Sequence, residues 1–310
     1  MKMNKRITIK DTDLSICPIG FGTVNAGTAW GNDDDFEIIE KYIELGGNVI
    51  DCARVYTDGR AEEVLGRWIT KRGKRDDLII ITKGGHPLFE SMNVSRMSRE
   101  EMEADLNTSL KALCVDTIDI YFYHRDDLSQ PVSDLIELME SFVREGKIRY
   151  YACSNWTTER MKEADEYCKA KGYRGFVANQ MLFNMAAETM KPFPDKTMVA
   201  MDDKMIEYHK TSKNLAMPYF GVCSGFFHIL AAKGEEAVRN SPYYTRKNLE
   251  LAARIEALRE KYNATISQIL LGFFFQRGMD ICPLAGADNE QQLLEAMGTF
   301  DIDFDPKDFV

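Results

Sequence analysis

Three stretches of the sequence share one pattern, an apolar run that ends at a polar residue. Residues 48–53 are NVIDCA, residues 78–83 are LIIITK, and residues 118–124 are IDIYFYH. Nearly continuous apolar runs of this length are typical of parallel strands that helices cover. The runs place Asp51, Lys83 and His124 at the carboxyl ends of their strands, where barrels of parallel strands build their active sites.

The same pattern continues along the chain and predicts eight strands. They are Cys17–Thr23, Asn48–Ala53, Leu78–Thr82, Ile118–Tyr123, Ile148–Cys153, Phe176–Asn179, Leu215–Phe220 and Asp280–Leu284. Helical patterns lie between them, with capping boxes at Ser98–Glu101 and Thr265–Gln268 and a proline, Pro131, suited to a first helical turn.

Eight strand-helix units in 310 residues predict a (β/α)₈ barrel, and no linker or shift in composition divides residues 1–310 into two domains. A short β-hairpin is expected in about the first eleven residues, at the amino end of the barrel. Long loops are expected on the carboxyl end, where they follow strands. They are Val24–Asp33, Gly84–Met97, Asn184–Met198 and Gly225–Asn263.

Composition excludes several classes of protein. Lys and Arg number 39 and Asp and Glu 49, so the formal charge is −10, which disfavours binding to nucleic acid. Seven scattered cysteines and four histidines without ligand spacing give neither a disulfide framework nor a metal site, and His209 is expected to be solvated. The amino end has no signal-peptide core, and no window is apolar enough to span a membrane, so a cytoplasmic protein is expected.

Four side chains combine into one chemistry. Asp51, Lys83 and His124 end adjacent predicted strands, and Tyr56 follows Asp51 by five residues. A nearby lysine cation lowers the pKa of a phenol, an aspartate holds that lysine charged, and a histidine can orient a carbonyl. Each of these residues alone could simply bond to backbone at a strand end. Together they indicate a proton donor beside a polarised carbonyl.

At these residues the sequence resembles the aldo-keto reductase family, over essentially the whole chain from Ile19-Gly20-Phe21-Gly22-Thr23 onward. The segment from Tyr56 to Gly66 ends in Glu-x-x-Leu-Gly and is similar to the family's catalytic-tyrosine segment. Asp51, Lys83 and His124 match the other catalytic positions, with Cys52 in place of a common threonine.

The resemblance implies a nicotinamide cofactor, NAD(P)H, extended across the barrel mouth, and no metal. The residues that it implies for cofactor binding are Gly22, Thr23, Ser154, Asn155, Gln180, Tyr219, Gly286, Ala287, Asp288 and Gln292. The basic residue expected near Asp288 for a 2′-phosphate is missing, and Leu284–Met297 holds no Lys or Arg. NAD is therefore expected to be favoured over NADP, although Arg246, Lys247 or Arg277 could reach this loop from elsewhere.

The predicted activity is hydride transfer between the cofactor and an aldehyde, ketone, or sugar or polyol, with Tyr56 as general acid and base. Trp30, His86, Phe89 and Phe226 lie on loops expected to wall the substrate pocket, and loop packing explains them equally well. Two alternatives stay open. One is a cofactor-binding regulatory subunit on the same fold, and the other is a sugar epimerase or lyase that oxidises its substrate transiently with retained NAD. The substrate, the direction of the reaction and the oligomeric state are not specified by the sequence.

Overall fold

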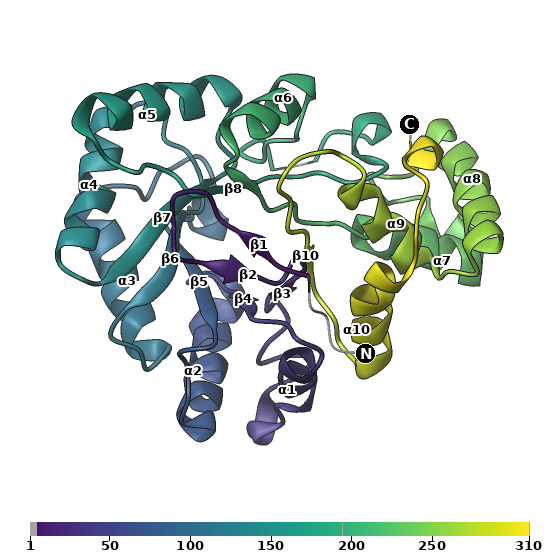
Figure 1. Ribbon diagram of the computed structural model, residues 1–310, viewed down its shortest axis with the longest axis horizontal. Helices are drawn as coiled ribbons and strands as arrows, with labels where there is room; N and C mark the ends of the chain where they lie inside the picture. The colour runs from purple at the N-terminus through teal and green to yellow at the C-terminus, as the bar shows by residue number, and fades with distance from the viewer. Residues whose placement is uncertain (1–4, 194, 310) are drawn as a thin grey trace.

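A computed structural model describes residues 5–193 and 195–309 of the chain. Its centre is one sheet of parallel strands in the order β10-β3-β4-β5-β6-β7-β8-β9 (Figure 1). The strands are β3 (Gly20–Gly22), β4 (Val49–Asp51), β5 (Ile79–Gly84), β6 (Ile118–Tyr123), β7 (Ile148–Ser154), β8 (Ala178–Gln180), β9 (Leu215–Ala216) and β10 (Leu284–Ala285).

The two edges of this sheet meet, which closes the barrel. Ala216 at the end of β9 forms a parallel bridge with Ile281, just before β10. The Ala216 amide donates to the Asp280 carbonyl at 3.0 Å, and the Cys282 amide donates to the Ala216 carbonyl at 2.8 Å. Closure removes the exposed sheet edges and brings the carboxyl ends of all eight strands to one face.

Helices surround the strands, one after each strand in chain order. They are α1 (Glu37–Glu44), α2 (Arg60–Arg72), α3 (Arg99–Ala112), α4 (Val132–Arg144), α5 (Thr158–Lys171), α6 (Asp203–Ser212), α9 (Ile266–Phe275) and α10 (Glu290–Met297). Two more helices, α7 (Phe226–Lys233) and α8 (Arg246–Tyr262), fill the long connection between β9 and α9. The predicted (β/α)₈ fold is confirmed. One domain over residues 1–310 remains our interpretation.

The expected capping residues begin their helices. Ser98 accepts a hydrogen bond from the Glu101 amide at the start of α3, and Thr265 and Gln268 form a reciprocal capping box at the start of α9. Pro131 lies directly before α4. The side chains of Ser98, Thr265 and Gln268 satisfy amide groups that lack partners at the start of a helix, whereas Pro131 makes no capping hydrogen bond.

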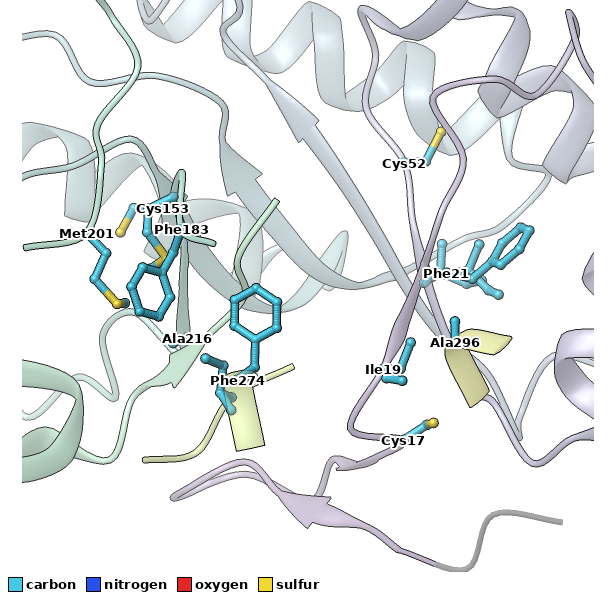
Figure 2. Close-up of a cluster of buried hydrophobic side chains, with 14 of the residues drawn as sticks. Cys17, Ile19, Phe21, Cys52, Cys153, Phe183, Met201, Ala216, Phe274 and Ala296 are labelled. Atoms are coloured by element: carbon cyan, nitrogen blue, oxygen red, sulfur yellow. The ribbon is translucent and has the colours of Figure 1, made fainter. Parts of the chain in front are cut away.

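Apolar side chains fill two layers of the molecule. Inside the barrel, Val49, Ile81 and Phe122 cluster with Leu14 and Ile16 of the amino-terminal segment. Outside it, strand residues pack against the helices, as where Phe21 lies 5.3 Å from the ring of Tyr42 on α1. Figure 2 shows members of this outer cluster, including Phe183 and Phe274, whose rings are 5.8 Å apart.

The amino-terminal hairpin extends beyond its expected end near residue 11. β1 (Ile7–Thr8) pairs antiparallel with β2 (Ser15–Ile16), and residues 1–4 lie outside the described residues. The longer hairpin is needed for Leu14 and Ile16 to reach the barrel interior, which caps its amino end as predicted.

Three further expectations need correction. β9 ends at Ala216 rather than Phe220, and β10 begins at Leu284 rather than Asp280, because Pro218 and Pro283 have no amide to donate to a strand ladder. His209 is fully buried rather than solvated, with Nδ1 2.8 Å from the Asn214 carbonyl oxygen, because α6 ends there and the chain turns back into β9.

In the part of the chain described, no helix is both long and apolar enough to cross a membrane.

Candidate active site

The four residues predicted to carry chemistry come from neighbouring elements of the barrel. Asp51 is the last residue of β4, Lys83 is next to last in β5, and His124 directly follows β6. β4 pairs with β5 and β5 with β6, so these strand ends are adjacent. Tyr56 begins the short 3-10 turn after β4. The structure brings the four side chains together, and their catalytic roles remain predictions.

Lys83 is the centre of the group. Its ammonium donates to Asp51 Oδ2 at 2.8 Å, to the Cys52 carbonyl at 2.7 Å and to the Tyr56 hydroxyl at 3.3 Å. The side chain is 1% exposed. Because an ammonium has three N–H donors, these contacts use all of them and fix the direction of the charge toward Tyr56.

Gln180, which the resemblance assigned to the cofactor, also supports this group. Its Nε2 donates to Asp51 Oδ1 at 2.6 Å from the end of β8. Both oxygens of Asp51 are thus hydrogen-bonded, one to Lys83 and one to Gln180. The carboxylate of Asp51 thus joins β4 to its neighbour β5 and to β8, which lies opposite β4 in the barrel order.

Burial decides the protonation states of the tyrosine and the lysine. It raises the pKa of Tyr56 above the ordinary value of 10, and the charge on Lys83 opposes that rise. Burial also disfavours charge on Lys83, but Asp51 and the other acidic groups around it outweigh this and raise the pKa of Lys83. The expectation of a lowered tyrosine pKa is corrected, because removal from water exceeds the effect of the cation. Tyr56 is a neutral phenol beside a charged lysine at neutral pH.

His124 is neutral and has a nitrogen available to the cavity. Burial, followed by the charges of Arg125 and Lys83, holds the pKa of His124 well below 6.5. Among the described residues neither ring nitrogen has a hydrogen-bond partner, and Nδ1 is buried. A buried N–H without an acceptor is rarer than a buried acceptor without a donor, so the proton is favoured on Nε2. The ring of His124 is 5.9 Å from that of Tyr56.

A cavity of about 350 Å³ opens above these residues. Its walls include seven residues that the resemblance assigned to the cofactor, which are Gly22, Thr23, Ser154, Asn155, Gln180, Tyr219 and Gly286. They share the cavity with Asp51, Tyr56 and His124. The polar amides and hydroxyl of this wall therefore lie beside the proposed proton donor.

Asn155 links the two sides of this cavity. Its Oδ1 accepts from the Tyr219 hydroxyl at 2.6 Å and from the Val199 amide at 3.1 Å. Its Nδ2 donates to the Ser154 hydroxyl at 3.0 Å. The backbone of Asn155 is left-handed, with φ of 63°, a conformation that asparagine tolerates better than most residues.

Arg125 is a cavity residue that the sequence reasoning did not assign to the site. Its guanidinium bonds to the His124 carbonyl at 2.8 Å, Thr197 at 2.7 Å and Asp195 at 3.0 Å. It also lines a second groove of about 580 Å³ with His86 and Phe89. The sequence feature that could have identified Arg125 is its position directly after His124, at the carboxyl end of a strand. The contacts with Asp195 and Thr197 could not be read from sequence because those residues lie 70 and 72 positions away.

The expected substrate walls separate in the structure. His86 lies 4.7 Å from His124 between ring centroids, and Phe89 lies 5.4 Å from His86; both line the second groove rather than the cavity at Tyr56. Trp30 instead lines a groove beside α1 and α10. Phe226 is buried against Phe227 and Tyr243. Neither Trp30 nor Phe226 lines the cavity at Tyr56, because Trp30 packs against Phe21 of β3 and Phe226 begins α7.

The remaining residues assigned to the cofactor follow β10, beyond Gly286. Ala287 is buried, and Asp288 accepts from Asn25 Nδ2 at 2.8 Å. The Asp288 amide donates to Gln292 Oε1 at 2.9 Å. Ala287 and Asp288 precede α10, Gln292 lies in its first turn, and none of the three lines the cavity at Tyr56. Over residues 5–193 and 195–309, no three His, Cys, Asp or Glu side chains group as metal ligands would.

Known proteins resemble the chain in sequence and in fold. The profile of the Aldo/keto reductase family matches residues 18–310. The chain is 22% identical over 303 residues to an aryl-alcohol dehydrogenase, GME11368, from Pestalotiopsis microspora, which covers 93% of this chain and 76% of that protein. It is 29% identical over 222 residues to the aldo-keto reductase YhdN of Bacillus subtilis (strain 168), which covers 70% of this chain and 62% of that protein.

A third relative is named with its cofactor. The aldo-keto reductase yakc (NADP(+)) of Schizosaccharomyces pombe is 24% identical over 92% of this chain and 84% of its own length. Among solved structures, the thermostable aldo-keto reductase Tm1743, crystallised with the inhibitor epalrestat, matches with a TM-score of 0.74 at 20% identity. That match covers 98% of this chain and 97% of the other, and it shows the common fold.

Proposed function

The chain belongs to the aldo/keto reductase family and is an oxidoreductase that works with a nicotinamide cofactor, and we propose that Tyr56 is the acid and base of its reaction. The reaction we propose is hydride transfer between the cofactor and a carbonyl or alcohol substrate. The observation that carries the proposal is the contact of the Tyr56 hydroxyl, which lines the cavity, with the buried Lys83 ammonium 3.3 Å away.

The cavity wall supports a nicotinamide at this place. A carboxamide needs both donors and acceptors, and Ser154, Asn155 and Gln180 offer both. The flat ring of Tyr219 lines the same cavity. These residues would hold the nicotinamide, which supplies the hydride.

The chain's own residues do the rest of the work. In reduction, the neutral Tyr56 phenol donates its proton to the carbonyl oxygen as that oxygen gains charge. Lys83 stabilises the phenolate that remains, and Asp51 keeps Lys83 charged and aimed. The Nε2–H of His124 donates to the same carbonyl oxygen and orients it. In oxidation these steps run backward, and Tyr56 is the base.

The substrate extends from the cavity toward His86 and Phe89 in this proposal. Phe89 is 68% exposed and lies beside His86, which gives the second groove an aromatic surface. Aromatic aldehydes and alcohols are therefore the first candidates, and one relative is named an aryl-alcohol dehydrogenase. Sugars and polyols remain candidates through Arg125 and Asp195 in the same groove.

A substrate screen tests the proposed function. Aromatic and aliphatic aldehydes, ketones and sugars are offered with NADH or NADPH, and the matching alcohols with NAD or NADP, while the absorbance of the reduced cofactor is followed. We expect carbonyl-dependent oxidation of at least one reduced cofactor.

Two results would favour the alternatives. Binding of a cofactor with no turnover of any carbonyl or alcohol would favour a regulatory subunit. Cofactor that stays with the protein through gel filtration, together with no net change in its redox state, would favour an epimerase or lyase.

A further inference from the structure

The turn that carries Tyr56 has an unusual backbone. Thr57, Asp58 and Gly59 all have left-handed conformations, with φ of 48°, 55° and 87°. A β-branched residue such as threonine is an outlier in this region. Such conformations persist only where the surrounding structure holds them, and they often position functional groups. The position of the Tyr56 hydroxyl therefore depends on what holds this turn.

Arg54 packs against this turn. Its guanidinium fills the space next to Gly59, where a Cβ would come within 2.0 Å of Nη2. The Arg54 backbone amide donates to the carbonyl of Lys83 at 3.0 Å. The same residue thus touches the turn that carries Tyr56 and the strand that carries Lys83.

Glu62 joins these parts through a buried carboxylate. One oxygen accepts from Arg54 Nη1 at 2.8 Å, and the other accepts from the Thr82 hydroxyl at 2.7 Å. Glu62 and Thr82 are both fully buried, and Thr82 is the residue before Lys83. The contacts run without a break from the turn of Tyr56, through Arg54 and Glu62, to β5.

We infer that Glu62 is a positioning residue for the reaction, which sets the distance between the Tyr56 hydroxyl and Lys83. This inference rests on the proposed role of Tyr56. A buried ion pair is often no more stable than a well-packed apolar replacement, so stability alone is a weak reason for a carboxylate here. Its two directed hydrogen bonds tie together two segments whose relative position decides whether Lys83 reaches the phenol.

Two substitutions of the same residue provide the test. Thr82→Val removes the hydroxyl with little change of shape, and Thr82→Ser keeps it. We expect Thr82→Val to lower kcat about tenfold or more, since small displacements in a catalytic pair are costly. Its cofactor Kd should stay within about twofold of wild type, since Glu62 does not line the cavity. Alcohol oxidation should move to higher pH, and Thr82→Ser should retain most of kcat. Equal kcat and equal pH profiles in the two variants would overturn the inference.

A second pair of variants acts on Arg54. Gly59→Ala places a methyl group where the Arg54 guanidinium lies, whereas Gly73→Ala at the other end of α2 meets nothing within 4 Å. Both glycines are left-handed, with φ of 87° and 65°, so both changes strain the backbone. We expect both to lower the melting temperature and only Gly59→Ala to lower kcat. An equal kcat in both would count against the inference.

Crystal structures of Thr82→Val and Glu62→Gln separate this inference from the proposed function. We expect the distance from Tyr56 Oη to Lys83 Nζ to exceed hydrogen-bonding range in both variants, whether or not a substrate is known. An unchanged distance overturns the positioning role alone. A wild-type protein without turnover overturns the proposed function and leaves this measurement decisive for Glu62.

Discussion

Tyr56 and Lys83 form a pair in which burial and charge act in opposite directions. Burial keeps the phenol protonated above pH 10, while the cation stabilises the phenolate. A donor with a raised pKa is in its active form for reduction throughout the neutral range. Oxidation needs the phenolate, so its rate should rise as pH increases toward the pKa of Tyr56.

Tyr56→Phe removes the proton donor and keeps the ring. We expect kcat for carbonyl reduction to fall about 10²–10⁴-fold, the usual contribution of general acid catalysis, with cofactor binding nearly intact. Tyr150→Phe is a matched control, since Tyr150 bonds to Asp13 outside the cavity. A kinetic isotope effect on hydride transfer should be confirmed first, because slow product release would hide the loss. Retention of more than about a tenth of kcat would rule out this role of Tyr56.

Lys83→Met removes the charge that opposes the rise in the pKa of Tyr56. The folded-state pKa of the phenol should rise further, so alcohol oxidation should slow and require higher pH. Asp51→Asn should act in the same direction less severely, because the lysine remains. The measurement is the pH profile of kcat/KM for oxidation, with Lys204→Met at an exposed pair with Glu159 as the control. A profile that coincides with wild type would show that Lys83 and Tyr56 are not coupled.

Among the elements of the barrel, the segment from β10 into α10 is the one expected to meet the adenosine end of the cofactor. The acidic residues at the start of this segment, Asp288 and Glu290, already have partners. Asp288 bonds to Asn25, and Glu290 pairs with Lys41 at 3.0 Å. Two distant cations are bonded elsewhere, since Arg246 pairs with Glu250 and Arg277 donates to the Phe309 carbonyl. A 2′-phosphate would meet acidic side chains here.

We therefore predict that NAD(H) is used at least as well as NADP(H). The segment has no Lys or Arg of its own, Asp288 carries a like charge, and Lys41, which reaches the segment, is paired with Glu290, so the phosphate should be disfavoured by a few kcal/mol, or about tenfold or more in kcat/KM. The measurement compares kcat/KM for NADH with kcat/KM for NADPH, using one substrate. Asp288→Asn should reduce the ratio between these two values. Because a relative is named with NADP(+), a strong preference for NADPH is the result that would refute this reading of the loop.

On the scale of the whole molecule, stability in acid depends on groups that the fold buries in a neutral form. His209 is fully buried between the end of α6 and the start of β9, and its Nδ1–H donates to the Asn214 carbonyl. Burial lowers its pKa from 6.5 to about 4. Below pH 6.5 the unfolded chain takes up a proton on His209, and the folded protein does not until about pH 4.

Folding stability should therefore fall as pH decreases from 7 toward 4, and the contribution of His209 levels off below that. From the pKa shift of His209 we expect the free energy of unfolding to fall by about 2 kcal/mol between pH 7 and pH 5. His209→Asn keeps a donor for the Asn214 carbonyl and cannot titrate. The free energy of unfolding of this variant should therefore fall by about 2 kcal/mol less than that of the wild type over the same pH interval. Free energies of unfolding in urea at the two pH values measure this. Equal losses in the two proteins would mean that His209 is not responsible.

The sequence determined those features that depend on neighbours along the chain. Apolar runs specified the strands, the capping residues Ser98 and Thr265 specified helix starts, and Asp51, Lys83 and His124 came at strand ends because each ends an apolar run. Parallel pairing then required their side chains to converge, which is why the candidate site could be located before the fold was known.

Tertiary structure alone decided the contacts that join distant segments. Gln180 reaches Asp51 across 129 residues, Arg125 reaches Asp195 across 70, and Glu62 meets Thr82 only once β5 lies beneath α2. The sequence did not predict burial either, since both His209 and Phe226 are buried in the structure. The net pKa of Tyr56 sums removal from water against the charge of Lys83, and neither quantity exists until the barrel closes around them. The sequence determines which groups are present and where each lies along the chain. Their distances from one another and their exposure to water follow from closure of the barrel.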